Sequence, residues 1–169
     1  MRFFLVLTTL VLSSLSWAQQ PKRPCDLPEG KQFDFWLGVW EVSWKGPDGK
    51  VSKGTNTVQK ILDSCIVEEH FQGGPLEGKS YSVYDPQSKL WKQTWIDNQG
   101  SYIALSGWFK DGKMELRTGP RKGPSGKTAI FRMVFRNITA DGLQWDWQQS
   151  EDNGKTWTDA WLITYKRKS

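Results

Sequence analysis

Apolar and polar residues alternate along most of this chain, in short runs that turn residues separate. Side chains at positions i and i+2 of a strand lie on the same face, so alternation predicts strands with one apolar face. The clearest run spans residues 128–137, where one face is apolar and the other carries arginines. The apolar residues are Ala129, Phe131, Met133 and Phe135, and the arginines are Arg132 and Arg136.

Similar runs follow one another through the chain after residue 33, and the links between them are short. Turn signals such as Asp48-Gly49, Asp111-Gly112 and Asp141-Gly142 stand between runs, and residues 118–126 form the one long irregular loop. This rhythm predicts an all-β domain, a single up-and-down barrel of about ten antiparallel strands, because closure removes exposed strand edges. The predicted strands are residues 35–44, 54–62, 65–72, 79–84, 89–97, 102–110, 113–117, 128–137, 143–149 and 157–166.

The tryptophans indicate an aromatic interior. The chain has 11 of them, and several pairs stand two or four residues apart, which places both rings on one face of a strand. A barrel of eight to ten strands leaves room for a small ligand. We therefore expect the walls of such a site to be formed by Trp91, Trp95, Trp145 and Trp147.

Polar residues on these faces are candidates to orient a ligand. Gln93 lies between Trp91 and Trp95 on the same face as Asp97. Glu69 shares its face with Val67 and Phe71, whereas His70 lies on the opposite face. Alternation does not decide which of these two faces points inward. A buried carboxylate must be paired or protonated, so an inward Glu69 would be a functional candidate.

The N-terminal residues predict export. Arg2 precedes an apolar run over residues 3–12, and Ser16-Trp17-Ala18 has small residues at the positions that a signal peptidase requires. The apolar run is shorter than the roughly 20 residues that cross a membrane. We expect residues 1–18 to be a signal peptide that is cleaved near Ala18, which gives a periplasmic or extracellular protein.

Two cysteines, Cys25 and Cys65, belong to the exported portion and predict one disulfide in an oxidising compartment. The bond would tie an N-terminal lead-in, residues 19–32, to the barrel domain, residues 33–169. Loop closure over this separation is worth about 4 kcal/mol in the chain-entropy model.

Charge and histidine content restrict the function classes. The net charge of +5 is mild, and its basic residues gather at residues 117–127 and 166–168, which we interpret as a solvated loop and tail. Nucleic-acid binding needs a concentrated basic face, so no nucleic acid and no stable membrane insertion are expected. His70 is the only histidine, so neither a metal site nor a cofactor is predicted. No oligomeric state is predicted.

The segment Phe33-Asp34-Phe35-Trp36-Leu37-Gly38-Val39-Trp40 is the most distinctive motif. Gly38-Val39-Trp40 resembles the Gly-x-Trp signature of the first strand of lipocalins and other calycins, which implies a lipocalin-like barrel. In that superfamily the Trp packs at the closed end against a basic residue from the last strand. The resemblance thus implies that Gly38, Trp40 and Arg167 close the barrel.

The longer motif is similar to the opening of a family of secreted bacterial calycin-like domains of unknown function. The similarity continues through Cys65-Ile66-Val67-Glu68-Glu69-His70-Phe71, Gly78-Lys79-Ser80 and Trp91-Lys92-Gln93-Thr94-Trp95. It implies a barrel fold and export, and brings no activity with it. A further motif, residues 150–157, resembles the Asp-box turn of sialidase blades, for which we expect a structural role.

Three functions are compatible with these patterns. The first is binding of a small apolar or aromatic ligand inside the barrel, with Glu69 and Gln93 orienting its polar groups. The second is a hydrolase or isomerase that uses Glu69 or His70 as a base, and Glu69 with Asp97 is a conceivable acid–base pair. The third is an interaction module with a solid aromatic core. A cavity of about 300 Å³ or more would favour the first two.

Overall fold

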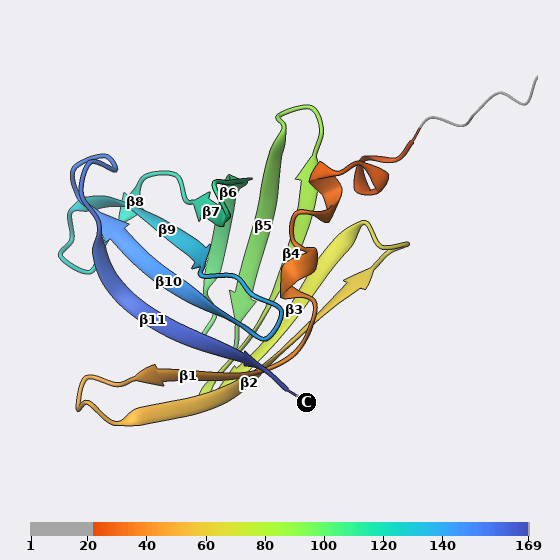
Figure 1. Ribbon diagram of the computed structural model, residues 1–169. Coiled ribbons are helices and arrows are strands. Elements are labelled where there is room, and N and C mark those ends of the chain that lie inside the picture. The colour runs from red at the N-terminus through yellow and green to blue at the C-terminus, as the bar shows by residue number, and fades with distance from the viewer. Residues whose placement is uncertain (1–21, 169) are drawn as a thin grey trace, which may run out of the picture.

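The computed structural model describes residues 22–168. They form eleven strands and three short 3-10 helices, which loops connect (Figure 1). The expected signal peptide, residues 1–18 with its cleavage site near Ala18, lies outside these residues. No helix in the described part of the chain is long and apolar enough to cross a membrane. The helices are η1 (Pro24–Asp26), η2 (Glu29–Lys31) and η3 (Asp34–Trp36). The strands are β1 (Gly38–Lys45), β2 (Val51–Ile61), β3 (Ile66–Gly73), β4 (Leu76–Asp85), β5 (Leu90–Asp97), β6 (Tyr102–Lys110), β7 (Lys113–Arg117), β8 (Arg121–Lys122), β9 (Thr128–Arg136), β10 (Gly142–Ser150) and β11 (Thr158–Arg167).

Ten of these strands close into an antiparallel barrel. Each strand from β1 to β7 pairs with the next, β7 pairs with β9, β9 with β10, β10 with β11, and β11 returns to β1. The two-residue β8 lies within the predicted irregular loop and pairs only with β9. The prediction of an all-β, lipocalin-like, up-and-down barrel of about ten strands is therefore confirmed.

The first predicted strand begins too early, because residues 34–36 form η3 and β1 starts at Gly38. Phe33 and Trp36 stand three residues apart, so a 3-10 turn directs both rings to one side. Both are fully buried. Phe33 packs edge-on against Trp91, with ring centroids 4.8 Å apart, and Trp36 packs edge-on against Phe135 at 4.9 Å. This segment therefore fills one end of the barrel instead of extending its sheet.

Arg167 completes the closed end. It is paired across the strands with Trp40, and its guanidinium carbon lies 4.1 Å from the centre of the Trp40 ring. Its Nη1 donates to the Leu37 carbonyl at 2.7 Å and its Nε donates to the Ala140 carbonyl at 2.6 Å. Gly38 has a φ of +122°, and a Cβ at this position would lie 2.5 Å from Arg167 Nη1. The glycine thus provides both the backbone conformation and the space for the guanidinium.

Two further features stabilise the barrel from outside its interior. The Cys25–Cys65 disulfide is present, as predicted, and joins η1 to the residue before β3. The Asp-box motif forms the turn between β10 and β11, where Asp152 accepts hydrogen bonds from the backbone nitrogens of Lys155 and Thr156. Both features support the frame of the barrel and lie apart from its interior.

Candidate functional site

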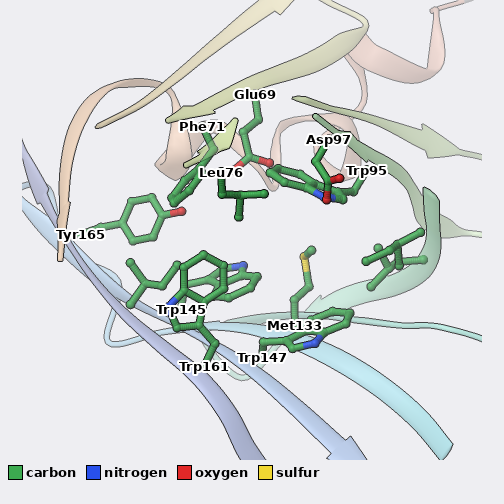
Figure 2. Close-up of a pocket in the computed structure, with 13 residues that line it drawn as sticks. Glu69, Phe71, Leu76, Trp95, Asp97, Met133, Trp145, Trp147, Trp161 and Tyr165 are labelled. Atoms are coloured by element: carbon green, nitrogen blue, oxygen red, sulfur yellow. The ribbon is translucent and has the colours of Figure 1, made fainter. Parts of the chain in front are cut away.

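The half of the barrel opposite the closed end contains a cavity of about 190 Å³ (Figure 2). Seven strands contribute to its wall, from β3 to β6 on one side and from β9 to β11 on the other. The lining residues are mostly aromatic or aliphatic, with two carboxylates among them. They are Glu69, Phe71, Leu76, Trp95, Asp97, Ile103, Leu105, Met133, Trp145, Trp147, Trp161, Ile163 and Tyr165.

The volume limits what the cavity holds. It lies below the roughly 300 Å³ at which drug-sized ligand sites begin. It exceeds the volume of about 150 Å³ at which an apolar protein cavity accepts benzene. By the volume criterion alone, the interaction module with an aromatic core is favoured. The interior is nevertheless not solid, and its hollow suits a molecule of about one aromatic ring with a short substituent.

The cavity has two chemically different walls. Figure 2 shows Glu69, Trp95 and Asp97 on one side, with both carboxyl groups directed inward. Trp145, Trp147 and Trp161 lie on the other side, below them in this view. A ligand in the cavity would lie between carboxylate oxygens and indole rings.

Glu69 is held in the middle of β3 by donors from the two neighbouring strands. The Asn56 amide of β2 donates to its Oε1 at 2.7 Å, and the Ser80 hydroxyl of β4, directly opposite in the register, donates to its Oε2 at 2.6 Å. The same Asn56 amide donates to the Tyr165 hydroxyl at 3.0 Å. Glu69 is only 6% exposed. Burial raises its pKa to about 7, and the hydrogen bonds from Ser80 and Asn56 limit the rise.

Asp97 ends β5 and lies nearer the open end. Its Oδ2 accepts from the Trp95 indole nitrogen at 3.0 Å, and its Oδ1 accepts from the backbone nitrogens of Gln99 and Ser101. Partial burial acts to raise the pKa of Asp97, but the donors, with Ser101 first, outweigh it and hold the pKa below its ordinary value. Gly78 lies opposite Asp97, and a Cβ there would collide with the Trp95 indole. Gly78 therefore makes room for this wall of the cavity.

The opposite wall is a continuous aromatic surface. The rings of Trp145 and Trp147 are parallel within 5°, with centroids 6.2 Å apart, and Phe131 stacks beyond Trp147. Trp161 meets Trp145 edge-on at 5.8 Å and Trp44 edge-on at 5.4 Å. Each such aromatic pair restricts the ring orientations. It stabilises the fold by about 0.5–1.5 kcal/mol in addition to the hydrophobic contribution of the buried area.

Trp161 also lies where the pairing between β1 and β11 is interrupted. The pairing of β1 with β11 ends at Ser43 and Thr164, and beyond these residues the strands diverge (Figure 1). The Trp44 and Trp161 rings meet across the divergence. Trp161 and Ile163 border the cavity on one side and an outer hollow between the two strands on the other.

The structure places four of the six predicted ligand-binding residues on the cavity wall: Glu69, Trp95, Trp145 and Trp147. Trp91 and Gln93 are not among the lining residues. They point inward as expected, but Gln93 lies one level deeper than Trp95 and Trp91 lies two levels deeper. There Trp91 packs on Phe33 and the Gln93 amide donates to Ser82 Oγ at 2.9 Å. Alternation predicts which face a side chain occupies but not its depth in the barrel. Each step of two residues moves a side chain about 7 Å along its strand.

His70 does not belong to the cavity. It lies on the outer face of β3, with its side chain 35% exposed, and its Nε2 lies 2.7 Å from Glu77 Oε1. The face of β3 that carries Glu69 is the inner one, so of the two catalytic candidates only Glu69 contacts the cavity. Glu69 and Asp97, the conceivable acid–base pair, both line it.

Sequence reasoning missed the two donors that hold Glu69, Asn56 and Ser80, and Tyr165, whose hydroxyl accepts from the same Asn56 amide. A signal for them was present. Asn56 shares its face of β2 with Val58, and Ser80 alternates with the outward Tyr81, so polar residues stand on inward positions of both strands. Next to an inward carboxylate, that pattern predicts donors.

Within residues 22–168, no group of three or more His, Cys, Asp or Glu side chains is arranged to hold a metal ion. The cavity wall offers hydrogen-bond acceptors and aromatic surface, and none of its lining residues is a lysine, arginine or histidine.

A family described as "Protein of unknown function (DUF1579)" matches residues 31–167, which include the signature segment, every barrel strand and the whole cavity wall. No curated protein matches the chain.

Proposed function

Because the chain belongs to the DUF1579 family of proteins of unknown function, we propose a role from its own cavity: the barrel binds a small apolar or aromatic molecule. The observation that supports this most is a hollow of about 190 Å³ inside the barrel, lined mostly by aromatic and aliphatic side chains. Interiors rarely keep voids larger than a water molecule, because each void loses packing contacts.

The size of the cavity sets the expected affinity. Burial contributes about 0.8 kcal/mol per CH₂-sized group. A ligand of roughly seven carbons thus gains about 5.5 kcal/mol, which corresponds to a Kd on the order of 0.1 mM. Hydrogen bonds to Glu69 or Asp97 would tighten binding and orient the ligand.

We place this binding outside the cytoplasm. The Cys25–Cys65 disulfide is a bond that persists in oxidising compartments. The signal peptide predicted for residues 1–18 agrees with this location, which makes the protein a periplasmic or extracellular binder.

Calorimetric titration with indole, phenol, benzyl alcohol and cyclohexanol tests the proposal. At least one of these soluble ligands should bind with 1:1 stoichiometry. Ile163→Trp should abolish binding because the added ring fills the cavity, whereas Leu162→Trp, on the adjacent outward position, should not. A heat signal that is equal in the two variants, or absent for these ligands and for a charged ligand of similar size, would contradict the proposal.

One observation favours a second candidate, catalysis by Glu69. A buried carboxyl whose pKa lies at about 7 is matched to general acid–base work at neutral pH. The substrate would be a small hydrolysable or isomerisable molecule in the same cavity. In that case Glu69→Gln should abolish turnover and retain ligand binding, whereas a simple binding protein shows no turnover in the parent chain.

A further inference from the structure

The two carboxylates of the cavity have no cationic partner among the residues that the structure describes. None of the ion pairs formed within residues 22–168 includes Glu69 or Asp97. Their hydrogen-bond donors are neutral: an amide and a hydroxyl for Glu69, and an indole and two backbone nitrogens for Asp97. Of the two, Glu69 is buried and Asp97 is partly exposed. A buried charge normally requires a counter-charge, so the ionised form of Glu69 lacks the cationic partner that burial calls for.

The protonation behaviour of the two groups supports a negative cavity at neutral pH. The pKa of Asp97 lies below its ordinary value, so this carboxyl is ionised. The pKa of Glu69 is about 7, so a substantial share of the molecules carries a second charge. An approaching cation would favour the ionised form of Glu69 further.

The aromatic wall opposite the carboxylates also favours a cation. Indole has the most negative ring face of the side chains, and an organic cation within about 6 Å of such a face is attracted by it. Trp145, Trp147 and Trp161 provide indoles opposite the carboxylates, and Phe71 and Tyr165 border the same space (Figure 2). Aromatic residues that surround an organic cation bind quaternary ammonium groups, because desolvation strengthens the cation–π attraction.

From these juxtaposed walls we propose that the cavity selects a small organic cation, such as a trimethylammonium group, over a neutral molecule of the same shape. This proposal rests on the proposed function, since it names the ligand class for the same cavity. The cation would lie between the Glu69 and Asp97 carboxylates and the rings of the tryptophan wall. Anionic ligands would be excluded by the same carboxylates, because no basic residue lines the cavity.

Choline and 3,3-dimethylbutan-1-ol test the proposal. The two molecules have nearly the same shape, but the charged nitrogen of choline is replaced by a neutral carbon in the alcohol. Calorimetric titration of the full chain at pH 8 should give choline an affinity at least tenfold higher, which is the scale of a desolvated cation–π contact. Asp97→Asn and Glu69→Gln should each lower the ratio of the choline affinity to the alcohol affinity severalfold. Glu68→Gln, which removes a carboxylate from the outer face of β3, should leave it unchanged.

The outcomes separate this proposal from the one on which it rests. Equal affinities for the two ligands, or binding of the alcohol alone, would overturn the cation selectivity and leave the binding function in place. A ratio that falls as much in Glu68→Gln as in Asp97→Asn would also overturn it, because the selectivity would then arise from the overall charge. Failure of both ligands together with the four neutral ligands above would overturn the binding function itself. If a carboxylate variant does not fold, the ratio in the parent chain decides alone.

Discussion

Replacing Glu69 by glutamine should make the stability of the protein less dependent on pH. The ordinary pKa of 4.5 describes the unfolded chain, and the pKa in the folded protein is about 7. At 1.36 kcal/mol per pH unit, this difference corresponds to about 3 kcal/mol. Glu69 is almost fully buried, so solvent screening does not reduce the figure substantially.

The direction of this pH dependence follows from the number of protons bound in the folded and unfolded states. Between pH 4.5 and 7 the folded protein holds a proton on Glu69 that the unfolded chain has released. The contribution of Glu69 to the free energy of unfolding therefore falls as pH rises through this window, and is constant above it. The glutamine side chain of Glu69→Gln does not titrate, and its amide can still accept from Asn56 and donate to Ser80. The variant should gain about 3 kcal/mol relative to the parent chain between pH 4.5 and 8.

Urea unfolding monitored by tryptophan fluorescence, at constant ionic strength from pH 4.5 to 8, measures this difference. Glu68→Gln is the matched control. The pKa of Glu68 is lowered, first by the hydrogen bond from Gln59, so above pH 5 the difference between this control and the parent chain should stay nearly constant. Parallel curves for the parent chain and Glu69→Gln would contradict the expectation, because they would show that Glu69 is as well solvated in the folded protein as in the unfolded chain.

Three variants, with Gly100→Ala as the control for the first, test the frame around the cavity. Gly38→Ala should cost about 2 kcal/mol or more, measured by thermal unfolding, because it combines a positive φ with a clash at the closed end. Gly100→Ala, at a φ of +81° with open space around it, should cost only about 1 kcal/mol. Gly78→Ala should displace the indole packed over it and weaken ligand binding in titration, and unchanged affinity would contradict the packing described here. The double substitution of Cys25 and Cys65 by serine should cost up to about 4 kcal/mol, and equal unfolding midpoints in urea would show that the crosslink adds no stability.

Strand positions were predictable because hydrophobic alternation and turn residues act locally. The run at residues 128–137 is an example: its apolar face is buried in β9 and its arginines lie on the outer side, as the sequence indicates. The closed end was predictable in part. Trp40 and Arg167 follow from the signature motif, but the inward turn of Phe33 and Trp36 depends on packing with Trp91 and Phe135, which are distant in the sequence.

The inner face of β3 was not predictable from that strand alone. Its two faces each combine apolar and ionisable residues, with Glu69 on one and His70 on the other. The choice is made by the neighbouring strands, since Asn56 and Ser80 provide donors that only the inner position of Glu69 can use. The same limit explains the depth of Trp91, because a period of two residues contains no information on how far along the barrel axis the cavity begins.

A crystal structure of the protein soaked with indole would decide whether the barrel is a binding site. We predict electron density for one indole ring between Trp95 and the tryptophan wall of β10 and β11, within contact of the Glu69 or Asp97 carboxylate. A cavity that is filled by its own tryptophan side chains, with indole bound only on the outer surface or not at all, would show that the barrel does not bind ligands in its interior.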